Sequence, residues 1–148
     1  MDNINLYTIG FTKKNAETFF TLLRKNGVKK LIDVRLNNVS QLAGFTKKDD
    51  LKYFLKELCG IEYYYCEQLA PTEDILKRYK NKEISWEQYE LEFNSLITKR
   101  KIEAIISLDL LIDACLLCSE ATAEHCHRRL LAEYFKKVYK RINNIIHL

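Results

Sequence analysis

The chain has 148 residues, of which 47% are hydrophobic, enough to bury the core of one domain spanning residues 1–148. One proline and four glycines exclude long linkers and low-complexity segments. The net charge of +4 permits an anionic partner but is too small to require nucleic acid.

The cysteine count and the apolar runs bear on the compartment. Five cysteines are an odd number and lie among apolar residues, which favours reduced thiols over a disulfide framework. Residues 1–5 lack the basic and apolar regions of a signal peptide. The longest apolar candidate, residues 102–118, is interrupted by acidic residues and falls short of the roughly 18 residues of a spanning helix. We therefore predict a cytoplasmic protein without a membrane partner, whose oligomeric state the sequence leaves open.

Five short runs of strand-forming residues alternate along the chain with helical patterns. The predicted strands are residues 6–11, 29–35, 61–66, 114–118 and 144–148. Their nearly continuous apolar character favours burial on both faces, as in a parallel sheet. The alternation predicts a single α/β domain with a Rossmann-like, mostly parallel sheet of about five strands and helices on both faces.

Apolar residues at helical spacing, together with capping signals, mark the predicted helices. They are a helix that ends at Gly27, residues 47–59 and 73–80, a helix that begins at Ser85, and residues 102–112 and 123–140. Thr46 and Thr72 are the predicted N-caps of the second and third helices. In the second, Tyr53, Phe54 and Leu58 are predicted to form the buried stripe. Residues 37–44 are predicted to form a loop.

Reactive side chains gather where the predicted strands end. Asp33 and Arg35 end the second strand, and Cys118 and Glu120 lie at the end of the fourth. In open α/β sheets, ligands bind outside the carboxyl ends of the strands. The sequence therefore predicts a functional site at this edge.

The segment of residues 116–131 holds more reactive groups than any other. Cys126 is predicted to lie near the start of a helix, beside His127 and Arg128. A helix N-terminus and neighbouring cations lower the pKa of a thiol, which would suit a nucleophile supported by His127. The alternative is a structural cysteine, because cysteine is among the most buried residue types.

The same segment allows a metal site as an alternative. The three candidate ligands are Cys118, Cys126 and His127. Zinc usually has four such ligands, and His125 or Glu120 could supply the fourth. The spacing is not a common zinc pattern, and because only three good ligands lie close together in the sequence, we expect no stably bound zinc. Cys115 and Cys118 form no redox pair, since residues three apart on a strand point to opposite faces.

Two arginines and two carboxylates complete the candidate site. Arg128 is predicted within the first two turns of the helix after Thr122, where free N–H groups and a guanidinium fork can bind phosphate or another oxyanion together with Arg35. The alternative is that Arg35 forms a structural ion pair with Asp33 or Glu120. Asp33 and Glu120 are the acid–base candidates, because a partly buried carboxylate has a raised pKa. For Asp33, a loop cap is the alternative.

Several motifs in combination resemble the family called domain of unknown function 488. The segments that carry the resemblance are Tyr7-Thr8-Ile9-Gly10, Asp33-Val34-Arg35, Gly44-Phe45, Gly60-Ile61-Glu62-Tyr63, and Leu117-Cys118-Ser119-Glu120 with Cys126-His127-Arg128. The resemblance extends from Tyr7 to Leu148. The family name implies no reaction.

The leading interpretation is an intracellular enzyme that acts on a phosphate-bearing or other anionic substrate, such as a nucleotide or nucleic acid, at the carboxyl edge of the sheet. Its predicted catalytic residues are Asp33, Glu120, Cys126 and His127, and its predicted anion ligands are Arg35 and Arg128. The alternative is a non-catalytic module that binds nucleic acid through its basic runs, or that binds a metal. The sequence identifies no cofactor.

Overall fold

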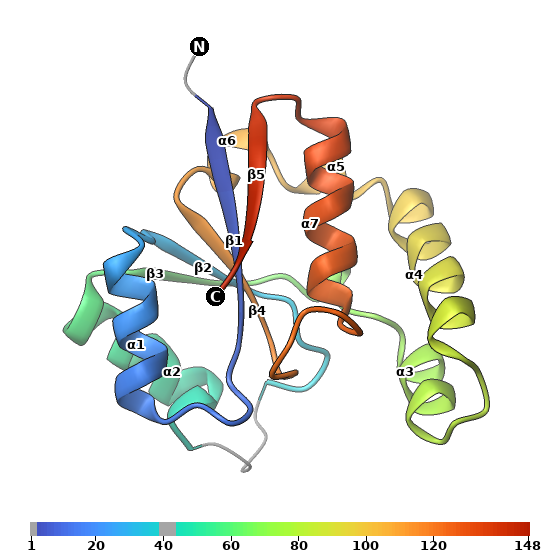
Figure 1. Ribbon diagram of the computed structural model, residues 1–148, viewed down its shortest axis with the longest axis horizontal. Coiled ribbons are helices and arrows are strands. Elements are labelled where there is room, and N and C mark those ends of the chain that lie inside the picture. The colour runs from blue at the N-terminus through green and yellow to red at the C-terminus, as the bar shows by residue number, and fades with distance from the viewer. Residues whose placement is uncertain (1–2, 39–43) are drawn as a thin grey trace.

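The computed structural model describes residues 3–38 and 44–148, and the strands in this part of the chain form one parallel sheet (Figure 1). The strands are β1 (Ile4–Gly10), β2 (Lys30–Asp33), β3 (Glu62–Tyr65), β4 (Ala114–Cys118) and β5 (Ile142–His147). Their order across the sheet is β3-β2-β4-β1-β5, and every neighbouring pair is parallel. The predicted five-stranded parallel α/β sheet is confirmed.

Burial along the strands follows their place in the sheet. The central strand β4 is buried at all five positions, because both of its faces are covered. The edge strands β3 and β5 keep exposed positions. The continuous apolar run that predicted β4 therefore reflects a position in the middle of the sheet.

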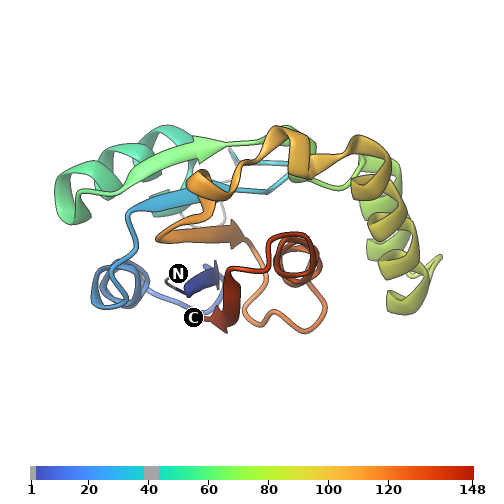
Figure 2. The same ribbon diagram turned by 90° about the horizontal axis from the view of Figure 1, so that it is seen from above.

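Helices pack against both faces of the sheet. On one face lie α1 (Ala16–Lys25) and α2 (Lys48–Phe54), whose apolar side chains join one core cluster. The second, larger cluster on the other face includes α4 (Trp86–Arg100) and α7 (His127–Val138). Figure 2 shows the pair of α4 and α3 (Glu73–Lys80) at the opposite end of the molecule from α1. The prediction of helices on both faces is confirmed.

Local capping explains where several helices begin. Thr72 and Ser85 accept hydrogen bonds from the backbone N–H groups of Ile75 and Gln88, and so begin α3 and α4 at the predicted positions. The stop predicted after α1 is also confirmed, since Gly27 has a φ of +68°, which glycine adopts without strain.

The helix predicted for residues 47–59 differs in three respects. Its N-cap is Lys47, not Thr46, and its last five residues, Leu55–Cys59, form a π-helical turn. The predicted buried stripe is wrong, because Tyr53 and Leu58 are 62% and 54% exposed. The buried residues are Leu51 and Leu55, and at about 100° per residue Tyr53 lies on the face opposite Leu51. The loop predicted for residues 37–44 lies mostly outside the described residues.

Two other predicted helices are shorter than expected. Residues 102–112 form two single turns, α5 (Ile102–Ile105) and α6 (Leu108–Leu111), because Ile106 is extended and Ser107 caps the second turn. The helix predicted to begin near residue 123 begins at His127, after an extended Cys126. Residues 119–126 therefore form a turn that leads from β4 to α7. The last strand begins at Ile142, two residues earlier than predicted.

Candidate functional site

The site forms where the chain leaves two neighbouring strands in opposite directions. After β2 the chain leads to α2 on one face of the sheet, and after β4 it leads to α7 on the other. The two strand ends are in register, since the backbone N–H of Val34 donates to the carbonyl of Leu117 at 3.0 Å. Connections that diverge in this way open a crevice at the carboxyl edge of a sheet.

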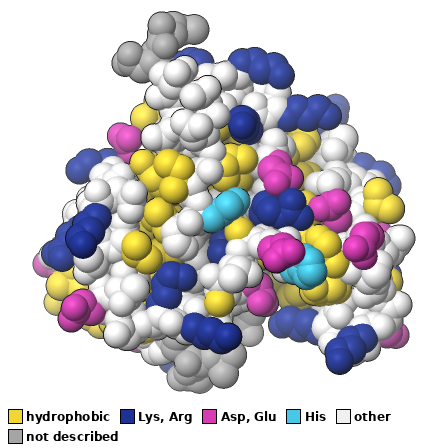
Figure 3. All heavy atoms as spheres, viewed as in Figure 1, with side chains coloured by type: hydrophobic (Ala, Val, Ile, Leu, Met, Phe, Trp, Pro, Cys, Tyr) yellow, Lys and Arg dark blue, Asp and Glu magenta, His cyan; other side chains and the backbone are white. Residues whose placement is uncertain are grey.

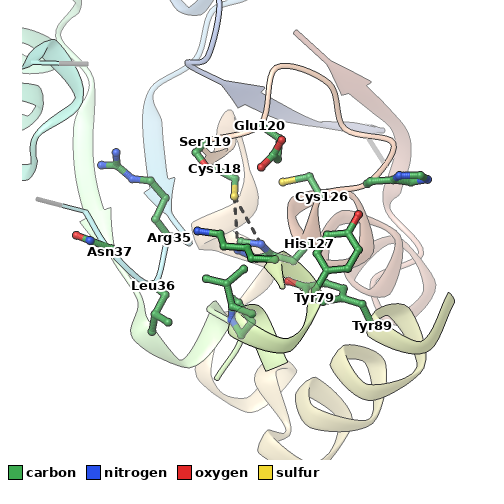
Figure 4. Close-up of a pocket in the computed structure, with 14 residues that line it drawn as sticks. Arg35, Leu36, Asn37, Tyr79, Tyr89, Cys118, Ser119, Glu120, Cys126 and His127 are labelled. Carbon is green, nitrogen blue, oxygen red and sulfur yellow. Dashed lines mark hydrogen bonds between the residues drawn. The ribbon is translucent and has the colours of Figure 1, made fainter. Parts of the chain in front are cut away.

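Three buried reactive side chains meet at this edge (Figure 4). Cys118 is the last residue of β4, Cys126 is the N-cap of α7, and His127 is the first residue of α7. Their sulfur and ring nitrogen atoms all lie within 4.8 Å of one another, and the side chains are 4%, 2% and 6% exposed. We call Cys118, Cys126 and His127 the thiol–imidazole cluster.

The orientation of His127 is set by the backbone. Its Nε2 lies 2.7 Å from the carbonyl oxygen of Val34, which can only accept, so Nε2 carries the proton. In the neutral ring, Nδ1 then has a free lone pair, and it lies 3.5 Å from the sulfur of Cys118. The ring is held from the other side by Phe93, with ring centroids 5.4 Å apart.

The pKa values of the two thiols in the cluster shift in opposite directions. A hydrogen bond from Cys126 and the backbone N–H groups of Ser119 and Glu120 hold the pKa of Cys118 below its usual value, although burial opposes them. Burial, and then the neighbouring Cys118, raise the pKa of Cys126. The prediction of a lowered pKa at Cys126 is therefore wrong, because burial and the neighbouring Cys118 outweigh the position of Cys126 at the helix N-terminus. The thiolate-prone residue is Cys118.

The thiol–imidazole cluster lines a cavity of about 120 Å³. Arg35 contributes to its wall from the end of β2, and Glu120 from the turn after β4. Tyr79, Lys80 and Tyr89 reach it from α3 and α4, which sequence reasoning did not foresee. Nothing in the sequence marked these three, because the approach of α3 and α4 to the sheet edge depends on tertiary packing.

Asp33 and Arg35 form a buried ion pair. Arg35 donates through Nε and Nη2 to the two carboxylate oxygens of Asp33, both at 2.9 Å, and Tyr63 donates its hydroxyl to the same carboxylate at 2.6 Å. Arg35 also donates to the carbonyl of Thr46 at 2.7 Å and lies over the ring of Phe11. The alternative of a structural pair between Arg35 and Asp33 is thus what the structure shows. Arg35 still lines the cavity, whereas Asp33 lies beneath it, and the acid–base role of Asp33 stays a prediction.

Arg128 is the second residue of α7, within the predicted two turns. Its side chain is fully buried and donates to the carbonyl of Glu120 at 2.8 Å and to the hydroxyl of Thr8 at 3.3 Å. The expectation that this side chain faces a ligand and lies outside the core is wrong. Arg128 is absent from the cavity wall, so its anion-binding role stays a prediction without support from the geometry.

Four residues were predicted to share one cleft, and the structure confirms this only in part. Arg35 and Glu120 line the cavity, while Asp33 and Arg128 are buried behind its walls. His125, suggested as a fourth metal ligand, is exposed and stacks on Trp86 with ring centroids 5.0 Å apart. It lines the cavity but is not part of the thiol–imidazole cluster.

Cys115 and Cys118 lie on opposite faces of β4 and so form no redox pair, as predicted. The side chain of Cys115 belongs to the core cluster on the α1 face, whereas Cys118 belongs to the cluster on the α7 face. All five cysteines are free.

These features define a parallel α/β protein with a buried thiol–imidazole cluster at the carboxyl edge of its sheet. The chain belongs to the family described as "Domain of unknown function DUF488", which matches residues 15–135 and so includes the whole cluster. The resemblance inferred from the motifs is thereby confirmed. Neither the comparison with curated proteins nor that with solved structures found a match. Among the described residues, no helix is long and apolar enough to cross a membrane.

Proposed function

We propose that this chain is an enzyme that acts on a small anionic substrate in the carboxyl-edge cavity, with the thiol–imidazole cluster as its reactive centre. The observation that carries the proposal is the convergence of two thiols and an imidazole on the wall of a cavity at the diverging ends of β2 and β4. A nucleophile or ligand, an acid–base group and a concave site are thus combined in one place.

The preference for an anion rests on the charges around the cavity. Lys80 lies in its wall, and α7 begins beside it, with the free N–H groups and partial positive charge of a helix N-terminus. Arg35 also lines the wall, but its guanidinium is paired with Asp33 and adds no free charge. The buried guanidinium of Arg128, which is bonded to the carbonyl of Glu120, adds a fixed positive charge behind the wall. A phosphate-bearing substrate fits this field best.

The volume limits which part of the substrate enters. The cavity of about 120 Å³ is well below the roughly 300–1,000 Å³ of pockets that enclose a drug-sized ligand. The cavity therefore accepts an anionic head group of phosphate size, while the rest of the substrate lies outside. An intact nucleic-acid duplex does not fit, although a terminal phosphate does.

Glu120 is the proposed proton-transfer group. It lies two residues after Cys118 on the same turn, is exposed, and lines the cavity that the cluster lines. Its backbone is held by two bonds, because Arg128 donates to its carbonyl and its own N–H is directed to the Cys118 sulfur. A carboxylate on a fixed backbone beside a reactive centre suits general acid–base chemistry.

Turnover of a panel of phosphomonoesters, phosphodiesters and nucleotides tests this function. Replacing Glu120→Gln should lower kcat by about 100-fold or more without changing the fold, because the amide cannot take a proton. Glu124→Gln is the matched control, since Glu124 is an exposed carboxylate on the same turn that does not line the cavity. Equal turnover by the two variants, or no turnover of any member of the panel, would contradict the proposal.

The alternative of a nucleic-acid-binding module is less well supported. Figure 3 shows lysine and arginine side chains scattered among acidic ones on the face drawn, without a continuous basic stripe. Binding to DNA or RNA that falls steeply as salt is raised would support this alternative.

A further inference from the structure

We propose that Cys118, Cys126 and His127 are three ligands of one divalent transition metal, for which zinc is the best match, and that its fourth position opens to the cavity. This inference rests on the proposed function and deepens it, because the metal would be the reactive centre of the same site. The sequence argued against stable zinc because only three good ligands lie close together in the chain. Three protein ligands are, however, the number that a catalytic zinc site has.

The distances agree with a tetrahedral zinc ion. With a Zn–S bond of about 2.3 Å and a Zn–N bond of about 2.05 Å, tetrahedral geometry separates sulfur from nitrogen by about 3.6 Å. The structure has 3.5 Å between the sulfur of Cys118 and Nδ1 of His127. Two sulfurs on one zinc lie about 3.8 Å apart, and the ligand atoms of the cluster are all within 4.8 Å of one another. Completing the three-ligand geometry requires the ring of His127 to turn its Nδ1 lone pair toward the two sulfurs, together with movements of about 1 Å.

The tautomer of His127 is the one that a metal ligand bound through Nδ1 needs. The hydrogen bond from Nε2 to the carbonyl of Val34 fixes the tautomer and leaves Nδ1 with a free lone pair, while the sulfur of Cys118 lies 3.5 Å from Nδ1 and 3.8 Å from Nε2, beside the face of the ring. Metal-bound histidines almost always donate their second ring N–H in this way, to a carboxylate, a carbonyl or water.

Cys115 shows what a purely structural cysteine looks like on the same strand. It is fully buried, and its sulfur contacts only the carbonyl of the next residue among the hydrogen-bonding groups of the described chain. Cys118, by contrast, faces a second cysteine, a histidine and two backbone N–H groups. Cys118 therefore has the neighbours that a metal ligand needs, whereas Cys115 does not.

The ligand types select the metal. Thiolates and imidazole favour zinc and related transition ions, whereas magnesium and calcium favour oxygen ligands. As each metal–sulfur bond forms, the thiol proton passes to solvent, and the neutral imidazole loses none. Two thiolates balance the charge of a divalent ion, so the metal can be buried at this depth.

Titration of the chelator-treated protein with Zn²⁺, in competition with a chelator of known affinity, tests the site. We expect one zinc per chain and no binding of Mg²⁺ under the same conditions. Cys118→Ala and Cys126→Ala should each weaken zinc binding by about 100-fold or more, and Cys115→Ala, the control on the same strand, should leave it unchanged. Absence of zinc binding in the wild-type protein, or equal affinity in the Cys118→Ala and Cys115→Ala variants, would overturn the inference.

A spectroscopic measurement on the wild-type protein keeps the test independent of whether the variants fold. Co²⁺ in place of zinc should give a thiolate-to-cobalt charge-transfer band in the near ultraviolet, and absence of the band would overturn the inference. The two proposals fail separately. Zinc binding without turnover of the substrate panel contradicts only the proposed function, whereas turnover by a protein that binds no zinc contradicts only the metal site.

Discussion

Arg128 is the largest fully buried side chain among the described residues, and it links three parts of the fold. From the first turn of α7 it donates to the carbonyl of Glu120 in the turn after β4 and to the hydroxyl of Thr8 in β1. Thr8 in turn is bonded to Nδ1 of His147 in β5. A charged side chain thus holds the turn that follows Cys118 and carries Glu120 against the rest of the sheet.

Replacing Arg128→Ala should therefore lower the free energy of unfolding by about 3 kcal/mol or more, because charge-assisted hydrogen bonds are lost and a buried cavity is left. Chemical denaturation measures this loss. Arg129→Ala is the neighbouring control, since its ion pairs with Glu90 and Glu133 are partly exposed to solvent and should contribute much less than the fully buried contacts of Arg128. Equal stability of the two variants would mean that Arg128 is not structural.

The effects of replacing Asp33 and Arg35 on the free energy of unfolding should depend strongly on each other. Asp33→Asn should lower the free energy of unfolding by about 3–5 kcal/mol, because the guanidinium of Arg35 remains buried without its counter-charge. Adding Arg35→Met should restore a large part of that loss, since no unpaired charge is left. A double variant as unstable as the sum of the two single variants would show that the pair is not coupled.

His147 should make the stability of the fold decrease at acidic pH. His147 is exposed as a whole, but partial burial of its ring, and then the positive charge of Arg128, lower its pKa in the folded state below the unfolded value of about 6.5. Between these two pKa values the unfolded chain binds more protons, so stability is full above pH 6.5 and falls as the pH drops through this interval. We expect His147→Gln to lose less stability than the wild-type protein between pH 7.5 and pH 5. An identical loss in both proteins would contradict this origin of the acid sensitivity.

At the scale of the elements, β1 and the turn after β4 approach each other closely at Gly10. A Cβ placed there would lie 1.6 Å from the carbonyl oxygen of Glu120 and 2.9 Å from Nη1 of Arg128. Only glycine allows this approach, which brings the end of β1 next to the turn that carries the site.

Gly10→Ala should therefore destabilise the fold by more than about 3 kcal/mol, or prevent folding, because backbone would have to move. Gly44→Ala is the control, since nothing lies within 4 Å of a Cβ at that position. Thermal unfolding of the two variants decides the matter. A melting temperature for Gly10→Ala close to that of Gly44→Ala would contradict the packing described.

The bounds of the helices and strands show which features the sequence could predict and which it could not. The bounds of β4 and α3 were predicted correctly, because a fully buried run and a threonine cap are local signals. The start of α7 was predicted about four residues too early, because Cys126 is held in an extended conformation beside Cys118, a contact between residues eight positions apart. The face of α2 was wrong because aromatic residues at helical spacing resemble a core stripe, whereas the leucines at positions 51 and 55 are buried instead.

At the scale of the whole molecule, topology accounts for the part of the site that was foreseen. Parallel strands gather their carboxyl ends at one edge, so Arg35, Cys118 and Glu120 could be placed together without coordinates. The tyrosines of α3 and α4 could not, because their position over that edge depends on how two distant helices pack. Nor could the depth of Arg128 be predicted, since charged residues are rarely buried completely.

Binding of a small anion in the carboxyl-edge cavity is the central claim, and amide chemical shifts measure it residue by residue. Inorganic phosphate added to the isotopically labelled protein, both zinc-loaded and metal-free, should shift the backbone amides of Ser119, Glu120 and His127. These shifts should saturate along one binding curve. Shifts that do not saturate, or that are confined to exposed lysines such as Lys136 and Lys137 on the far end of α7, would contradict the claim.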